Sequence, residues 1–235
     1  LEFNRSASLA GLIIGGAIAV GMGFVDDIVG LRPFHKLVFQ VVAASVAYRL
    51  GFAITYVSLP FLNGVHLGWL SYPFTVFWFL ACMNAINLAD GLDGLAAGLA
   101  FFAILVMAVV GIWNGNTAAV FLSATIAAAT FGFLIHNFNP AKIYLGDSGS
   151  MLLGFWVAAL SICCARKATA AVSLLIPIIA LGLPIFDTSL AILRRWLRRL
   201  PISAGDRQHV HHVLLRLGLS HRNAVLVAYA VYIAL

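Results

Sequence analysis

The sequence contains little charge: Asp, Glu, Lys and Arg together make up 9% of its 235 residues, against about 25% in an ordinary soluble domain. Hydrophobic residues make up 63%. A soluble fold cannot be coated by so few polar side chains, and a disordered chain would need the opposite composition. We therefore expect a polytopic integral membrane protein, in which each acidic residue near the bilayer is a candidate functional group.

Cysteine is scarce as well, because the chain has only Cys82, Cys163 and Cys164, all in apolar stretches. Their spacing fits neither a zinc site nor a disulfide framework. The net charge of +6 indicates cytoplasmic loops of a membrane protein rather than a nucleic-acid partner. We expect one membrane-embedded domain over residues 1–235. We expect it to be truncated at both ends, because the sequence starts at Leu1 and stops within an apolar run.

Apolar runs are long enough for about eight transmembrane helices. They fall at residues 9–25, 37–58, 70–88, 95–113, 117–136, 149–165, 170–192 and 222–235. If Asp26 and Asp27 are cytoplasmic, alternation places four loops on that side, namely 26–36, 84–94, 137–148 and 193–221. These loops hold most of the Lys and Arg, as the positive-inside rule requires. We expect an all-α fold with its active site on the cytoplasmic face.

Each of the first three loops carries carboxylates beside other polar groups. The adjacent Asp26 and Asp27 repel each other, so each favours a nearby cation or proton; a solvated helix end is the alternative. Lys36 is either a phosphate-binding charge or a membrane anchor. If the helix continues, Asn84, Asn87, Asp90 and Asp93 follow one face. Two amides and two carboxylates are suitable for binding Mg²⁺ together with a phosphate. The alternative is a capped turn that only connects two spans.

The third loop ends in Gly146-Asp147-Ser148-Gly149 at a predicted helix start. Free N–H groups there favour a phosphate or a capping carboxylate. Asp147 is the first choice for a direct metal ligand, although plain helix capping would also explain it. Tyr144 is either a surface for stacking a base or an aromatic residue at the membrane interface.

The fourth loop contains Arg207, His209, His211 and His212. Because cysteine is absent nearby and a structural zinc site needs about four ligands, we favour an anion-binding cluster. The alternative is a solvated polar loop.

Together these motifs resemble the polyprenyl-phosphate N-acetylhexosamine-1-phosphate transferase family, of glycosyltransferase 4 type. The motifs are Asp26-Asp27, Asn84 to Gly94 followed by Leu95-Ala96, Gly146 to Ser150, and His209 to His212, in family order and across nearly the whole chain. The stretch from Pro201 to His212 is similar to the branch that uses UDP-GlcNAc. Phospho-MurNAc-pentapeptide transfer, in another branch, stays as the alternative.

The resemblance implies transfer of GlcNAc-1-phosphate from UDP-GlcNAc to undecaprenyl phosphate, with release of UMP. It implies Mg²⁺, with Mn²⁺ as a substitute, and a multi-pass protein of the bacterial inner membrane. The partners would be the two substrates and the lipid bilayer, without nucleic acid; a homodimer stays open.

The resemblance also implies roles for individual residues. Asp147 would bind the metal, and Asp26 would deprotonate or orient the lipid phosphate with support from Asp27. Asn84, Asn87 and Asp90 would position the diphosphate or metal, with Asp93 in the same catalytic group, and Lys36 would hold a phosphate. Asn137 and Tyr144 match positions near the uracil, and Arg207, His209, His211 and His212 would bind the pyrophosphate or sugar.

Two other classes fit less well. CDP-alcohol phosphotransferases need an Arg soon after the first Asp-Gly, and none follows Asp90-Gly91 before Gly98. A solute transporter would carry ionisable residues near the middle of its spans, whereas the Asp residues here gather at one set of ends.

Overall fold

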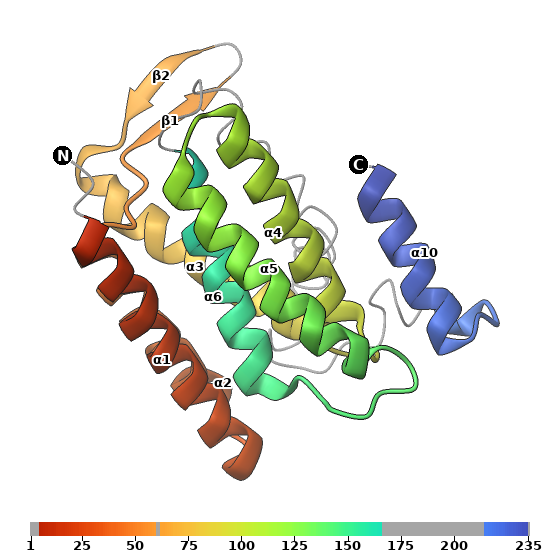
Figure 1. Cartoon of the computed structure of the whole chain (residues 1–235). Coiled ribbons are helices and arrows are strands. Elements are labelled where there is room, and N and C mark those ends of the chain that lie inside the picture. Colours follow the sequence, from red (N-terminus) through yellow and green to blue (C-terminus); the bar gives the residue numbers. More distant parts are fainter. Residues whose placement is uncertain (1–4, 60–61, 166–213, 235) are drawn as a thin grey trace.

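The computed structural model describes residues 5–59, 62–165 and 214–234, and most of them lie in helices that run back and forth through one bundle (Figure 1). The helices are α1 (Arg5–Val29), α2 (Pro33–Arg49), α3 (Ser71–Ala89), α4 (Leu95–Trp113), α5 (Thr117–Asn137), α6 (Gly146–Ala165) and α10 (His221–Ala234), and a short 3₁₀ turn, η1 (Gly68–Leu70), precedes α3. Within the described residues, five helices are long and apolar enough to cross a membrane. The chain is therefore a multi-pass membrane protein.

These five spans agree closely with the prediction. They cover Ser8–Val29, Gly68–Ala89, Leu95–Trp113, Thr117–Asn137 and Gly146–Cys164. The predicted total of eight is not confirmed. The helices at the predicted spans 37–58 and 222–235, α2 and α10, are not among the five, and the span at 170–192 lies outside the described residues. Arg207, His209, His211 and His212 lie outside them as well.

The predicted span at 37–58 was wrong in both its bounds. Helix α2 begins at Pro33, which is favourable in the first turn of a helix because its missing N–H is not needed there. It ends at Arg49, and Gly51 then adopts a φ of +114° that stops the helix. The chain continues into an antiparallel hairpin of β1 (Tyr56–Leu59) and β2 (Leu62–His66), in which Val57 pairs with Val65. Among the described residues, the all-α prediction was therefore wrong at this hairpin.

Glycines let the helices around α6 approach closely. At Gly154 of α6, an added Cβ would lie 2.5 Å from the Cα of Met83 in α3. At Gly23 of α1, it would lie 2.5 Å from the backbone N of Ser148 in α6. Helix α6 is thus held between α1 and α3 at near backbone-to-backbone distance, which small residues allow in membrane helices.

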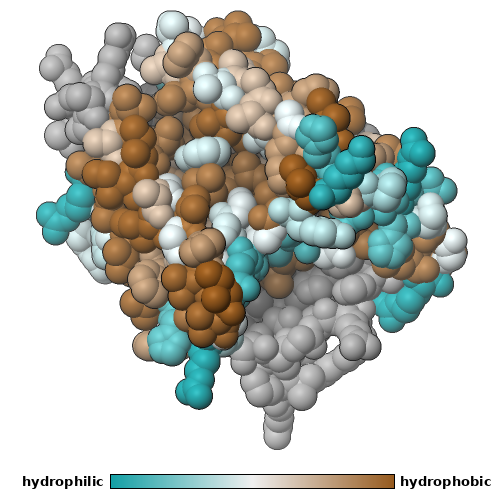
Figure 2. Space-filling view, turned by 60° about the horizontal axis from the view of Figure 1, so that its bottom comes forward, coloured by the Kyte–Doolittle hydropathy of each residue, from teal (hydrophilic) through white to brown (hydrophobic). Residues whose placement is uncertain are grey.

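The two ends of the bundle differ. The hairpin lies at one end, and the connections α1–α2, α3–α4 and α5–α6 lie at the other (Figure 1). Figure 2 brings this second end toward the viewer: hydrophobic residues cover the flank of the helices, and hydrophilic residues gather around the end. The predicted site residues of the first three loops all belong to this end.

Candidate active site

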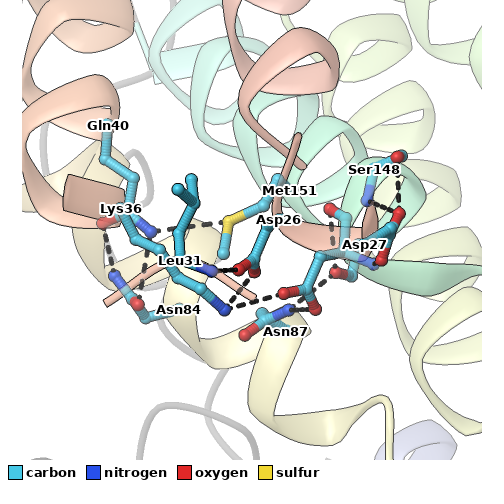
Figure 3. A network of polar contacts seen from close by, with 11 residues as sticks. Asp26, Asp27, Leu31, Lys36, Gln40, Asn84, Asn87, Ser148 and Met151 are labelled. Carbon is cyan, nitrogen blue, oxygen red and sulfur yellow. Dashed lines mark hydrogen bonds and ion pairs between the residues drawn. The ribbon is translucent and has the colours of Figure 1, made fainter. Parts of the chain in front are cut away.

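Lys36 links two carboxylates from different helices (Figure 3). Its Nζ donates a hydrogen bond of 2.8 Å to Oδ2 of Asp147 and forms an ion pair with Asp26. Asp26 belongs to the last turn of α1, and its Oδ1 accepts a bond of 2.6 Å from the backbone N of Leu31. The Asp26 side chain is 3% exposed, against 26% for Lys36 and 28% for Asp147. A ligand from solvent would therefore meet Lys36 and Asp147 first.

Asn87 of α3 fixes the other oxygen of Asp147. Its Nδ2 donates to Oδ1 of Asp147 at 2.7 Å and to Oγ of Ser150 at 2.9 Å. Both oxygens of Asp147 are thus held by donors, one charged and one neutral. We call Asp26, Lys36, Asn87 and Asp147 the charge cluster; its members come from α1, α2, α3 and α6.

Asp27 caps the N-terminus of α6 instead of facing Lys36. Its carboxylate accepts from the backbone N atoms of Asp147 (2.8 Å) and Ser148 (3.1 Å), and from Oγ of Ser148 (2.6 Å). Gly146 has a φ of +65°, and a Cβ there would lie 2.9 Å from Asp27. Of the two partners predicted for these N–H groups, the structure supplies the capping carboxylate, and α1 provides it.

Asp90 lies just beyond the end of α3, which stops at Ala89. The prediction that four polar side chains follow one helix face therefore holds for Asn84 and Asn87. It does not hold for Asp90 and Asp93, which lie beyond the end of the helix. Burial, together with the negative charges of Asp147, Asp27 and Asp93, raises the pKa of Asp90 to about 6. This accumulation of negative charge favours a cation beside Asp90.

Asp93 and Asn137 bind the backbone of neighbouring loops. Oδ2 of Asp93 accepts from Nδ2 of Asn139 at 3.0 Å and from the backbone N of Ala141 at 3.1 Å. Oδ1 of Asn137 accepts from the backbone N of Gly94 at 3.1 Å, and its Nδ2 donates to the carbonyl of Ile143 at 2.9 Å. We call Asp93, Gly94, Asn137 and Asn139 the loop junction, because these residues join the α3–α4 turn to the α5–α6 loop.

Tyr144 lies on the same α5–α6 loop and is 78% exposed. Its predicted stacking on a base is sterically open, since the ring faces solvent. Across the loop junction, the hydroxyl of Tyr229 in α10 donates to the carbonyl of Gly94. Nothing in the amino-acid sequence predicts that α10 lies beside this turn.

Sequence reasoning assigned no role to two polar residues next to the charge cluster, Gln40 and Ser150, although Ser150 ends one of the quoted motifs. Both are buried, at 2% and 0% exposure. Gln40 stands in an apolar run four residues after Lys36, and Ser150 follows Asp147 by three. A polar side chain inside a membrane helix is costly unless it is paired, so this placement was the available signal.

The charge cluster suits Mg²⁺ in its donor atoms. Among the described residues, no three His, Cys, Asp or Glu side chains group as an enclosing metal site. Mg²⁺ does not require one, because it keeps several waters and binds through one or two carboxylates plus substrate phosphates. Asp147 offers a part-exposed carboxylate, and the buried Oδ2 of Asp26 has no hydrogen-bond donor besides its ion pair with Lys36. Carboxylate oxygens of this kind fit the ion.

Known proteins resemble this chain over the same region. The family model described as Glycosyl transferase family 4 matches residues 9–165. A probable undecaprenyl-phosphate N-acetylglucosaminyl 1-phosphate transferase of Bacillus subtilis is 43% identical over 95% of this chain and 63% of its own length. A decaprenyl-phosphate N-acetylglucosaminephosphotransferase of Mycobacterium leprae is 36% identical over 97% of this chain and 63% of its own length.

Relatives with another name match less of the chain. A phospho-N-acetylmuramoyl-pentapeptide-transferase of Listeria monocytogenes is 37% identical over 64% of this chain and 50% of its own length. The chain spans about 63% of the length of the first two relatives. The family predicted from the motifs is confirmed, and the matched stretch contains the whole charge cluster: the chain belongs to glycosyl transferase family 4.

Proposed function

We propose that this protein transfers GlcNAc-1-phosphate from UDP-GlcNAc to undecaprenyl phosphate, forming undecaprenyl-diphospho-GlcNAc and releasing UMP. The observation that carries the proposal is the charge cluster, in which Asp26, Lys36 and Asp147 meet at one end of membrane-crossing helices. The printed name of the Bacillus subtilis relative supports the choice of sugar and acceptor.

The proposed site lies at the cytoplasmic face of the bacterial inner membrane. A lipid phosphate stays at the membrane surface, whereas a nucleotide sugar arrives from water. The two substrates can therefore meet only at an end of the bundle, and the charge cluster lies at the end that holds the α1–α2, α3–α4 and α5–α6 connections. This end carries Arg32, Lys142 and, in the first turn of α2, Lys36, and basic residues favour the cytoplasmic side.

In the proposed reaction, an oxygen of the lipid phosphate attacks the β-phosphorus of UDP-GlcNAc. The bond from that phosphorus to the bridging oxygen breaks, and the electron pair leaves with UMP. Because both substrates are anions, catalysis depends mainly on positioning and charge neutralisation. Lys36 offers its ammonium to a phosphate oxygen, and Asp26, buried behind it, holds that ammonium in place beside Asp147 and so orients it toward the lipid phosphate.

Mg²⁺, or Mn²⁺ in its place, would be held by Asp147 and, when bound, would neutralise diphosphate charge and polarise the reacting phosphoryl group. Asn87 and Lys36 orient the Asp147 carboxylate, and Asp90 adds negative charge nearby. Tyr144 would stack on the uracil from the α5–α6 loop. Asn137 would act near the uracil by holding the α5–α6 loop in place, because both its Oδ1 and its Nδ2 are hydrogen-bonded to backbone groups.

The test is an assay of UMP release in membranes from cells that express the protein. UDP-GlcNAc, undecaprenyl phosphate and Mg²⁺ are added together, and then each is omitted in turn. We expect UMP only when all three are present. Folded protein that releases no UMP above the background of control membranes would contradict the proposal.

A parallel assay compares UDP-MurNAc-pentapeptide and UDP-GalNAc as donors. The pentapeptide donor is the relevant alternative, because relatives with that specificity match 64% of the chain. We expect UDP-GlcNAc to be preferred; a preference for either other donor would keep the reaction class and change the sugar.

A further inference from the structure

Gln40 is a polar residue buried in the membrane bundle, and it pairs with Asn84 (Figure 3). Its Nε2 donates to Oδ1 of Asn84 at 3.3 Å, and Nδ2 of Asn84 donates to Oε1 of Gln40 at 2.9 Å. The two amides thus exchange hydrogen bonds between α2 and α3. Such reciprocal pairing removes the cost of burying both groups.

Asn84 has both of its hydrogens engaged within the protein. The second donates to the carbonyl of Leu80, one turn earlier in α3, at 2.8 Å. A direct contact from this amide to a diphosphate would require breaking one of these bonds. The structure therefore favours a role for Asn84 through its partner Gln40 rather than through substrate.

The amide pair lies one helical turn deeper than the donors that hold Asp147. In α2, Gln40 follows Lys36 by four residues, and in α3, Asn84 precedes Asn87 by three. Residues at these spacings share a helix face. The Gln40–Asn84 pair and the two donors to Asp147 therefore form two successive layers between the same helices.

Gln40 also contacts α6, the helix that carries Asp147. Its Nε2 lies 3.4 Å from the sulfur of Met151, four residues after Asp147 in α6. Gln40 thus touches α3 and α6, which carry Asn87 and Asp147, while its own helix carries Lys36. A change in its length or shape would shift all three relative to one another.

We infer that Gln40 and Asn84 form a positioning pair that sets the placement of Lys36 and Asn87 on the Asp147 carboxylate. The pair does not contact substrate; it determines how tightly the carboxylate binds its cation and how fast the phosphoryl group is transferred. The rate part of this inference rests on the proposed function, and the cation part does not.

The test exchanges the two amides. Gln40→Asn shortens the pair by one methylene, Asn84→Gln lengthens it by one, and the double variant restores the total length. The probe is Mn²⁺, titrated by electron paramagnetic resonance into the purified protein without substrates, beside kcat and KM for UMP release. We expect each single variant to lower kcat by about 10- to 100-fold, as ångström-scale misplacement does, and to weaken Mn²⁺ binding. The double variant should regain most of both.

A matched control separates positioning from general stability. Trp78 of α3 donates to the buried Oγ of Ser161 in α6 at 2.8 Å, so Ser161→Ala removes a bond between helices that also carry the site. We expect it to lower the unfolding temperature while leaving Mn²⁺ affinity and kcat per folded molecule unchanged.

The outcomes separate this inference from the proposed function. Single variants with wild-type Mn²⁺ affinity and kcat would overturn the pairing role, as would a double variant no better than the singles. If the wild-type protein released no UMP from UDP-GlcNAc, the proposed function would fail, and the Mn²⁺ titrations would still decide the role of the pair.

Discussion

The charge cluster and the loop junction lie at the same end of the bundle but use their polar side chains differently. In the charge cluster, Lys36 and Asn87 bind the carboxylate of Asp147, so side chains meet side chains. In the loop junction, Asp93 and Asn137 bind mainly backbone groups of neighbouring loops. Residues that look equally functional in the sequence therefore divide into a group available for chemistry and a group that holds loops.

Changing Asp147 should have the largest effect on activity. Asp147→Asn keeps the size of the side chain but removes the charge that binds Lys36 and the cation. We expect the rate of UMP release per folded molecule to fall by about 100- to 1,000-fold, the usual range for losing one electrostatic group at a reacting centre. The rate is measured in membranes against the amount of folded protein. A loss smaller than tenfold would contradict the assignment of Asp147 to the chemistry.

Asp27 should show an intermediate effect, because it is charged like the cluster but bonded to backbone like the junction. Asp27→Asn leaves one acceptor oxygen for the three donors of Asp147 and Ser148. We expect about 1 kcal/mol of lost stability, typical of a damaged helix cap, and a smaller rate loss than for Asp147→Asn. Thermal unfolding and UMP release are measured on the same preparations. A rate loss equal to that of Asp147→Asn without destabilisation would place Asp27 in the charge cluster.

The titration of Asp90 should make cation binding depend on pH. Its pKa is raised to about 6 by burial and by nearby negative charges. Below that pH the carboxyl is protonated and neutral, so Mn²⁺ affinity should fall as the pH is lowered through about 6. Asp90→Asn, which is neutral at every pH, should bind Mn²⁺ more weakly and lose this step. A step that persists unchanged in Asp90→Asn would assign it to another group.

Asn137 should show the smallest effect on the rate per folded molecule. Asn137→Ala leaves the backbone N of Gly94 and the carbonyl of Ile143 without this partner. Unpaired buried groups cost about 1–3 kcal/mol each, so the unfolding temperature should drop clearly. Asn137→Asp, which keeps an acceptor for Gly94 but turns a buried carboxylate oxygen toward the carbonyl of Ile143, should destabilise at least as much. If Asn137→Ala were stable but slow, Asn137 would belong to the chemistry.

The sequence was sufficient for most of the helices because long apolar runs specify membrane spans directly. It failed after Arg49, where the apolar run continues past Gly51 although the helix does not. Hydropathy cannot distinguish a helix from a hairpin strand there. The turn signal was present, since a basic residue in the last turn followed by Gly marks a helix end.

The gathering of Asp26, Lys36 and Asp147 also followed from the sequence, since alternation of the spans brings their loops to one end. The separate uses of Asp26 and Asp27 did not follow. Which carboxylate faces Lys36 and which faces α6 depends on the rotation of α1 against both neighbours. The pairing of Gln40 with Asn84 was hidden for the same reason, because it joins residues 44 apart in the chain.

The close glycine contacts of α6 have a consequence for the surrounding bilayer. Gly23 and Gly154 bring α1 and α3 to the backbone of α6, so the three helices cannot slide past one another by a fraction of a turn. A thinner or thicker bilayer is normally accommodated by tilting or by local deformation of the lipid. We expect α1, α3 and α6 to tilt as a unit, so that the relative placement of Asp26, Asn87 and Asp147, which these three helices carry, changes little across membranes of different thickness.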